Sequence, residues 1–238
     1  MAERQILFSG PMVRAILDGR KTQTRRVIKY NNELPRFIGG AGEEKNPAHY
    51  GWECDGARGI DWLTLIASGA TNEKTLQCPY GKPGDRLWVR ETWAYSFNSD
   101  MDVLWNRDYL YRATDGEHTV NRWKPSIHMP RKASRITLEI TNIRVERVQE
   151  ISDTDISAEG LNVTLHPGNI ATGDVELPNG TYRHSTARYC FESLWDSING
   201  TKVKKSGRTI TATRNYPWSL NPWVWVITFK KLESEARA

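Results

Sequence analysis

The segment ILDGRKTQTRR, residues 16–26, joins a helical pattern to a polar stretch and decides which fold we expect. Apolar residues within and just before it fall on one face of a helix over 11–18, with proline in the first turn and Gly19 directly after the end. The following residues have no apolar stripe, which predicts a loop that leads into an extended segment. Side chains alternate along an extended segment, so Thr24 and Arg26 would share one face.

Three polar side chains of this segment form a candidate site. Lys21 lies three residues before Thr24. A lysine that meets a hydroxyl can activate it as a nucleophile, provided that burial or neighbouring charges let the amine lose its proton near neutral pH. Arg26 stays charged and can hold a phosphate, a carboxylate or a developing oxyanion. The same residue types are common on exposed loops, so their spacing alone leaves a reactive site and an exposed loop both open.

The rest of the chain alternates between strand and helix patterns, without repeats or a clear linker. We expect strands at 86–93, 136–145 and 223–229, and helices at 152–160 and 187–198. The second of these patterns predicts either one long strand or two strands that meet at a bulge near Asn142. The third is apolar on both faces, which is typical of a central strand that is covered on both sides.

Three stretches without sustained periodicity are interpreted as insertions. They lie at about 30–82, 100–130 and 162–184, and the first contains one or two short strands, for example at 61–66. Because strands and helices are interleaved throughout, the chain is expected to form one α/β or α+β domain over residues 1–238.

Composition limits the partners that we expect. The 238 residues carry a formal net charge of +5, which favours an anionic partner such as a nucleotide or nucleic acid. The ten Trp residues either fill the core or stack on bases. The three Cys are too scattered for a disulfide framework, and the five His never form the close pairs of zinc-binding helices.

The same composition bears on location. No apolar run reaches the roughly 18 residues that a membrane span needs. Residues 1–8 lack the apolar core of a secretory signal. We therefore expect a cytoplasmic protein with no membrane partner, no metal and no obligate protein partner.

The pattern Gly19-x-Lys21-x-x-x-x-Arg26 has the spacing of the ASCH-domain signature, and residues 16–26 closely resemble the start of the small bacterial N4-acetylcytidine amidohydrolases. The resemblance implies an α+β fold, a PUA-like mixed β-barrel with flanking helices. The whole chain would then be a single ASCH domain that carries the three long insertions.

The resemblance continues in a strand near 86–91, in residues 135–160 and in the closing helix and strand. The small enzymes are less than half as long and lack the long insertions. The motifs at 85–93, 125–130 and 221–225 also resemble longer ASCH proteins that are often found in phages and prophages.

The resemblance assigns roles to three residues. The catalytic lysine and threonine of the amidohydrolases occupy the positions that Lys21 and Thr24 fill here, and their third catalytic residue is a glutamate in a short helix after a strand. That context recurs in ISDTDISAEG, residues 151–160, so Glu159 is the match. A glutamate directly before a helix-ending glycine also lies at the negative end of the helix dipole, which suits it to proton transfer. An exposed glutamate at a helix end is the plain alternative.

Two further residues are candidates for binding the substrate. Glu91 ends a strand whose register can aim it at the pocket, and it is the main rival of Glu159. Otherwise it is an edge residue that pairs with Arg90 or Arg86. His128, flanked by prolines, is either a donor or general acid in the pocket, or a structural histidine held by hydrogen bonds.

Together these residues imply hydrolysis of the exocyclic amide of an N4-acylated cytidine such as N4-acetylcytidine, as a free nucleoside or in RNA. Thr24 would attack the acyl carbonyl, Lys21 or Glu159 would take its proton, and Arg26 with backbone N–H groups would hold the oxyanion. Which of the two is the base stays open, as does attack by a glutamate-activated water. No metal or other cofactor is required. The competing functions are a non-catalytic RNA-binding module, because PUA-like barrels bind RNA, and a ribonuclease, an activity associated with some ASCH proteins.

Overall fold

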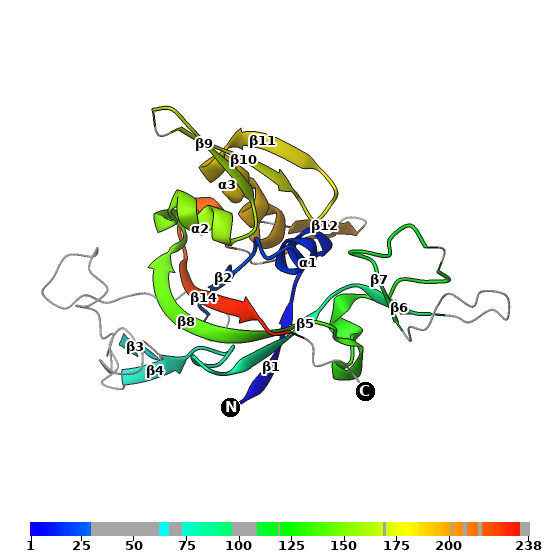
Figure 1. Ribbon diagram of the computed structural model, residues 1–238. Coiled ribbons are helices and arrows are strands. Elements are labelled where there is room, and N and C mark those ends of the chain that lie inside the picture. Colours follow the sequence, from blue (N-terminus) through cyan, green and yellow to red (C-terminus); the bar gives the residue numbers. More distant parts are fainter. Residues whose placement is uncertain are drawn as a thin grey trace, which may run out of the picture.

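The computed structural model describes residues 1–29, 62–66, 73–96, 109–118, 120–168, 170–200, 202–206, 209–213 and 216–233. A five-stranded mixed sheet with the order β1-β5-β8-β14-β2 lies at its centre (Figure 1). These strands are β1 (Glu3–Leu7), β5 (Arg86–Arg90), β8 (Thr137–Arg147), β14 (Trp223–Lys231) and β2 (Gln23–Val27). β1 and β5 are parallel, and all other neighbours are antiparallel.

Three helices accompany the sheet, and all three were expected from the sequence, which confirms an α+β protein. They are α1 (Gly10–Leu17), α2 (Asp153–Ala158) and α3 (Ala187–Asn199). Gly19 follows α1 with φ 76° and Gly160 follows α2 with φ 97°, a left-handed conformation that glycine adopts without steric cost. At the start of α2 the Ser152 hydroxyl accepts a hydrogen bond from the backbone N–H of Asp155, so this side chain caps the helix.

The strands predicted at 136–145 and 223–229 form the middle of the sheet as β8 and β14. Their register shifts between Thr228 and Phe229, where β8 carries one extra residue beside Asn142. Each alternative is therefore confirmed in part, because β8 is one long strand and it carries the bulge beside Asn142. Extra residues of this kind bend a strand and increase its twist.

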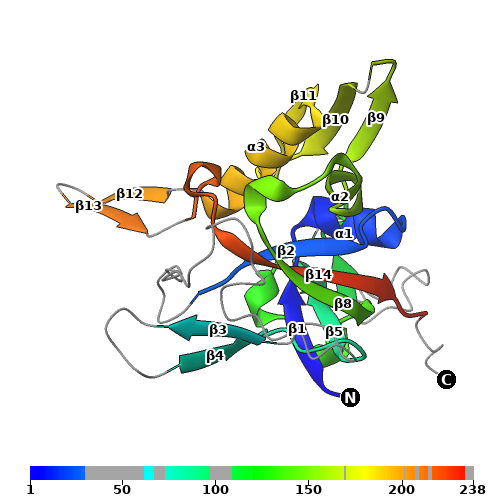
Figure 2. The same ribbon diagram turned by 90° about the vertical axis from the view of Figure 1, so that its left-hand side faces the viewer.

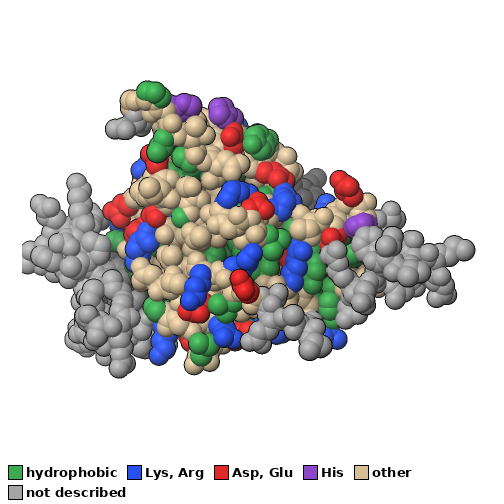
Figure 3. Space-filling model, in the orientation of Figure 1, with side chains coloured by type: hydrophobic (Ala, Val, Ile, Leu, Met, Phe, Trp, Pro, Cys, Tyr) green, Lys and Arg blue, Asp and Glu red, His purple; other side chains and the backbone are tan. Residues whose placement is uncertain are grey.

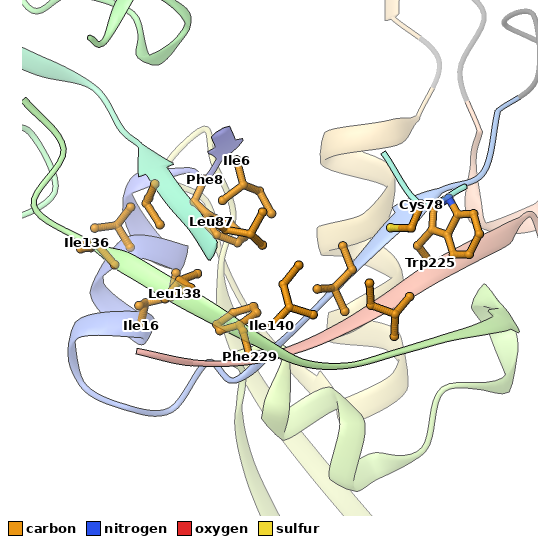
Figure 4. Packing of buried hydrophobic residues seen from close by; sticks show 14 of the residues in the cluster. Ile6, Phe8, Ile16, Cys78, Leu87, Ile136, Leu138, Ile140, Trp225 and Phe229 are labelled. Carbon is orange, nitrogen blue, oxygen red and sulfur yellow. The ribbon is translucent and has the colours of Figure 1, made fainter. Parts of the chain in front are cut away.

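Hydrophobic cores cover both faces of the sheet. Trp225 and Ile227 of β14 belong to the core that also includes α1 side chains (Figure 4). Val224 and Val226, which alternate with them, belong to the core that is shared with α2 and α3. Because alternate side chains of β14 enter different cores, both of its faces are apolar, as the sequence predicts.

Residues 162–184 were expected to be a loop, and this prediction is wrong. They contain most of a three-stranded antiparallel sheet made of β9 (Asn162–His166), β10 (Ile170–Glu176) and β11 (Tyr182–Thr186). The buried face of β10 carries Ala171, Gly173 and Val175, whose small side chains give little hydrophobic alternation. A Cβ at Gly173 would lie 3.0 Å from the Cα of Ala187, so the small residue lets α3 approach closely. This sheet and α3 lie together, away from the N-terminus (Figures 1 and 2).

Three two-stranded sheets complete the described strands. They are β3 (Trp62–Ile66) with β4 (Glu73–Gln77), β6 (Trp93–Tyr95) with β7 (Tyr109–Tyr111), and β12 (Lys202–Ser206) with β13 (Thr209–Thr213). The short strand expected at 61–66 is confirmed by β3. The single strand expected at 86–93 is wrong, because β5 ends at Arg90 and β6 begins at Trp93 in a different sheet.

Parts of all three expected insertions lie outside the described residues. In the insertion at 30–82 these are residues 30–61 and 67–72, in the insertion at 100–130 they are residues 100–108 and 119, and in the insertion at 162–184 it is residue 169.

The central sheet is curved and, among the described strands, open. Figure 1 shows β8 as a wide arc. β1 and β2 are the two edges and do not pair with each other. Arg26 on β2 nevertheless donates a hydrogen bond from Nη2 to the Leu7 carbonyl oxygen on β1, at 2.7 Å. The edges therefore approach each other through a side chain, and the described strands do not close the expected barrel.

The structure bears on three expectations from composition, which concern the cysteines, a metal site and membrane-spanning helices. Cys78 and Cys190 are free and buried, and Cys54 lies outside the described residues. Within the described ranges, no three His, Cys, Asp or Glu side chains come together as a metal site would require. Among the helices that the structure describes, none is long and apolar enough to cross a bilayer.

Candidate functional site

Lys21 lies where α1, β2 and α2 meet. Its backbone N–H donates to the carbonyl oxygen of Ala15 in α1 at 2.9 Å, and the N–H of Thr22 donates to that of Ala158 in α2, also at 2.9 Å. These two bonds fix the loop that the sequence predicts after α1. The Lys21 side chain is completely buried as a result.

The Lys21 amine has a full set of acceptors. Nζ donates to the carbonyl oxygens of Gln23 and Glu159, both at 2.8 Å, and to Oε2 of Glu159 at 2.7 Å. An ammonium group has three donors, so none is left unpaired in the interior. Burial lowers the pKa of Lys21, and the Glu159 carboxylate opposes this effect, whereas the nearby Arg26 and Arg25 add to it.

Glu159 lies at the end of α2 and is only 5% exposed, so the alternative of an exposed helix-end glutamate is wrong. Its Oε1 accepts a hydrogen bond from Nη1 of Arg25 at 3.3 Å, while Oε2 binds Lys21. A Cβ on Gly160 would lie 2.9 Å from the Ala15 Cβ and 3.0 Å from the Lys21 Cβ. The glycine therefore lets α2 pack against α1, and this packing brings Glu159 to Lys21.

The Lys21–Glu159 pair belongs to a larger buried ionic network. The network contains three basic and three acidic side chains: Lys21, Arg25 and Arg144 with Glu146, Asp155 and Glu159. At its centre, Arg25 binds Asp155 at 2.8 Å and Glu146 at 3.0 Å through Nη2, and Gln23 at 2.6 Å through Nη1. The three positive and three negative charges balance, which is the usual condition for burying ionised groups.

The sequence prediction missed Arg25. Its side chain is 1% exposed, and it bridges carboxylates that lie more than 100 residues away in the chain. Side chains alternate along a strand, so the pattern that places Thr24 and Arg26 on one face also places Gln23 and Arg25 together on the other. This alternation was the signal in the sequence from which Arg25 could have been found. The acidic partners were not predictable from it, because they come from β8 and α2.

The protonation state of Asp155 makes the contribution of this network to stability depend on pH. Burial alone would raise the pKa of Asp155, but the guanidinium groups of Arg25 and Arg144 outweigh it and hold this pKa below its usual value. A carboxylate with a depressed pKa stabilises the fold above its unfolded pKa, which is roughly 3.9, and loses this contribution as the pH falls through its folded pKa.

We therefore expect Asp155→Asn to make the free energy of unfolding depend less on pH in the acid range. The free energy of unfolding of the variant, measured by urea denaturation, should be lower at pH 7 and should fall less than that of the wild type between about pH 4 and pH 2. Asp153→Asn is the matched control, because Asp153 is exposed and belongs to the same helix. Equal pH dependence in Asp155→Asn and the wild type would contradict the assignment.

Thr24 lies on β2 at the free edge of the sheet and is 3% exposed. Together with Glu159, Phe191 and Trp195 it lines a cavity of about 60 Å³ between this edge and α3. Within the described part of the chain, its hydroxyl has no hydrogen-bond partner. Lys21 contacts Glu159 but is not part of the cavity wall.

Arg26 also lines this cavity, but most of its contacts lie on the other side. Its guanidinium group stacks over Phe8, 5.1 Å from the ring centroid, and over Tyr80 at 5.9 Å. Nη2 donates to the Leu7 carbonyl oxygen, and Nε is buried and has no hydrogen-bond partner in the part of the chain that the structure describes. Arg26 thus holds the two sheet edges together and keeps one donor unused near the site.

Glu91 lies away from Lys21, in another part of the structure. It is buried and forms two hydrogen bonds with Arg135, at 2.9 Å from Nε to Oε1 and at 3.1 Å from Nη2 to Oε2. Burial raises the pKa of Glu91, and Arg135 partly offsets the shift. The structure does not bring Glu91 to the Thr24 cavity, and its partner is neither Arg90 nor Arg86.

His128 lies outside the site as well. It is exposed and ends a 3-10 turn, Ser126–His128, in which its backbone N–H donates to Pro125. In the described residues its imidazole contacts neither the Thr24 cavity nor the ionic network. Its proximity to prolines therefore indicated a turn, not a position in the pocket.

The site thus joins a buried amine–carboxylate pair, an unpartnered hydroxyl and two guanidinium groups around a small cavity. Such a set can move a proton, supply a nucleophile and stabilise an anion. No known protein family, curated protein or solved structure matches this chain.

Proposed function

We propose that this chain is an ASCH-family amidohydrolase that removes the acyl group from N4-acylated cytidine. The observation that carries the proposal is the buried Lys21–Glu159 pair, 2.7 Å between Nζ and Oε2, beside a cavity that Thr24 lines with its unpartnered hydroxyl. A nucleophile, a carboxylate and an amine in one place meet the needs of metal-free acyl transfer. The curved sheet, whose edges approach through Arg26, supports the PUA-like barrel proposed with this function.

In the first step Thr24 Oγ attacks the acyl carbonyl carbon and Glu159 takes the hydroxyl proton. We assign the base to Glu159 because it lines the cavity with Thr24, whereas Lys21 reaches the cavity only through Glu159. The carbonyl electron pair moves onto oxygen as the new C–O bond forms. Arg25 and Arg26 line the same cavity and supply positive charge to this oxyanion.

Collapse of the tetrahedral intermediate then breaks the C–N bond. The proton on Glu159 passes to the exocyclic nitrogen, which leaves as the amino group of cytidine, and Thr24 keeps the acyl group as an ester. A water then attacks the ester carbonyl carbon and gives one proton to Glu159. When this second tetrahedral intermediate collapses, the bond between the acyl carbon and Thr24 Oγ breaks, Glu159 returns the proton to Oγ, and the carboxylic acid is released. Lys21 orients Glu159 throughout and balances its charge whenever the carboxylate is ionised.

The cavity size favours a small acyl group. A water-sized group needs roughly 10–15 Å³ on the same measure, so 60 Å³ has room for about four or five such groups. An acetyl group with its amide nitrogen fills this space, and the base and ribose would extend toward the opening. Acetyl is therefore the proposed acyl group.

The test is the release of cytidine from N4-acetylcytidine by purified protein, followed by chromatography. We expect Glu159→Gln to lower the rate by about 10²–10³-fold, because the amide keeps the shape of the side chain but cannot take the proton of Thr24. Glu117→Gln is the matched control, since Glu117 is exposed and remote from the cavity wall. No cytidine from the wild type at high enzyme concentration would overturn the proposed function.

A non-catalytic RNA-binding module is the second candidate, and one feature favours it. Tyr95 is 43% exposed, and the Nζ of Lys124 lies 4.1 Å from its ring centroid, a combination suited to stacking beside a phosphate. Against it, the face of the molecule drawn in Figure 3 shows Lys and Arg side chains mixed with Asp and Glu, without a continuous basic stripe. A pure binder would leave N4-acetylcytidine intact.

A further inference from the structure

A second and larger cavity lies at the amino-terminal end of α1. Its volume is about 370 Å³, within the range of small-molecule sites. The start of α1, the residues after β5 and β7, and the end of β10 form its walls. Neither Lys21, Thr24 nor Glu159 lines it, so it is separate from the proposed hydrolase site.

The wall of this cavity carries two arginines and two glutamates, but one of the glutamates is paired with Arg135, which lies outside the wall. Glu176 is bound to Arg14 at 2.5 Å, and Glu91 is bound to Arg135 at 2.9 Å, so both carboxylates already have a cation. Arg112 also lines the cavity, and its guanidinium group has no acidic partner in the described part of the chain. Its backbone N–H donates to the Thr92 carbonyl oxygen at 2.9 Å, which fixes the backbone of Arg112 at the wall, while the residue is exposed to solvent. The cavity therefore holds one cation that a ligand can neutralise.

The start of α1 contributes hydrogen-bond donors to the same wall. Ser9 and Gly10, which line the cavity, form the start of α1, and the Ser9 side chain makes no capping hydrogen bond. The Ser9 hydroxyl is buried and has no hydrogen-bond partner among the residues that the structure describes. The first backbone N–H groups of a helix also lack intrahelical acceptors and carry the positive end of its dipole. The free cation of Arg112 and the unpartnered hydroxyl of Ser9 are independent of each other, and both favour an oxyanion.

We propose that this cavity binds the phosphate group of a small phosphorylated molecule of nucleotide size. A phosphate presents several acceptor oxygens, which match an arginine fork, a serine hydroxyl and a helix start at once. The volume leaves room for the remainder of such a ligand next to Arg14, Thr92 and Asn179. This inference goes beyond the proposed hydrolase and does not depend on it.

The test is isothermal titration of the full chain with cytidine 5′-monophosphate and, separately, with cytidine. We expect saturable binding of the monophosphate, at least tenfold weaker binding of cytidine, and displacement of the monophosphate by inorganic phosphate. Arg112→Gln should weaken monophosphate binding by about tenfold or more, the usual loss for one charge-assisted contact. Ser9→Ala should weaken it in the same direction.

Arg122→Gln is the matched control, because Arg122 is an exposed arginine that does not line the cavity. It should leave the affinity unchanged. Equal affinities for cytidine and its monophosphate, or equal losses in Arg112→Gln and Arg122→Gln, would overturn the phosphate site. Thr24→Val should bind the monophosphate as the wild type does, so loss of hydrolysis and loss of phosphate binding are distinguishable.

Discussion

Thr24→Val should abolish cytidine release, with a fall in kcat/KM on the order of 10⁴-fold, and leave the fold intact. Loss of the nucleophile removes the acyl-enzyme route, and removal of one member of such a site costs almost as much as removal of all. Valine has nearly the same shape and suits a strand. The Thr24 hydroxyl has no hydrogen-bond partner in the described structure, so its removal breaks no internal bond. The thermal midpoint should therefore stay within a few degrees of the wild type or rise.

Thr22→Val is the control for this variant. Thr22 lies two residues earlier, and its side chain is exposed, so the loss of its hydroxyl should not change the rate. Retention of most of the activity in Thr24→Val would rule out a covalent intermediate on this residue. A glutamate-activated water would then be the mechanism to test.

Lys21→Met should destabilise the protein by about 3–5 kcal/mol in urea denaturation. Removal of one partner of a buried ion pair leaves the other charge without compensation, which is the costly way to break such a pair. In this variant Glu159 keeps only its 3.3 Å bond to Arg25, while its Oε2 loses the amine at 2.7 Å. The Gln23 and Glu159 carbonyl oxygens lose the same donor. Methionine has a similar volume, so the effect is not one of packing.

The double variant Lys21→Met/Glu159→Gln separates charge from packing. It removes both charges of the pair, so part of the stability lost in Lys21→Met should return. The two side chains are not coupled if Glu159→Gln lowers the free energy of unfolding by the same amount in Lys21→Met as in the wild type. That result would remove the basis for Lys21 as the partner of Glu159.

Local patterns in the sequence determined much of the framework. The helix before Gly19, the capped helix before Gly160 and the doubly covered strand at 223–229 all appear as expected. Each rests on side-chain periodicity or on a cap within a few residues, and both act over one or two turns of chain. The β9–β11 sheet was not predicted, because the buried face of β10 carries Ala and Gly, and these small residues give little hydrophobic alternation.

The residues of the candidate site also fall into those that the sequence predicted and those that it did not. Lys21, Thr24 and Glu159 were named from spacing and resemblance, and the structure places all three at one junction. Arg25 was missed, because a buried arginine and an exposed one look alike in a sequence. Glu91 was expected nearby but is bound to Arg135 in another part of the structure.

The sequence by itself determined where helices and strands begin and which polar residues are able to react. Only the tertiary structure decided which charges meet, because the carboxylates around Arg25 come from β8 and α2, more than 100 residues away. It also decided that Thr24 and Glu159 share a cavity while Glu91 belongs to a different one. The physical reason is that caps and periodicity are local, whereas burial and ion pairing depend on contacts between distant segments.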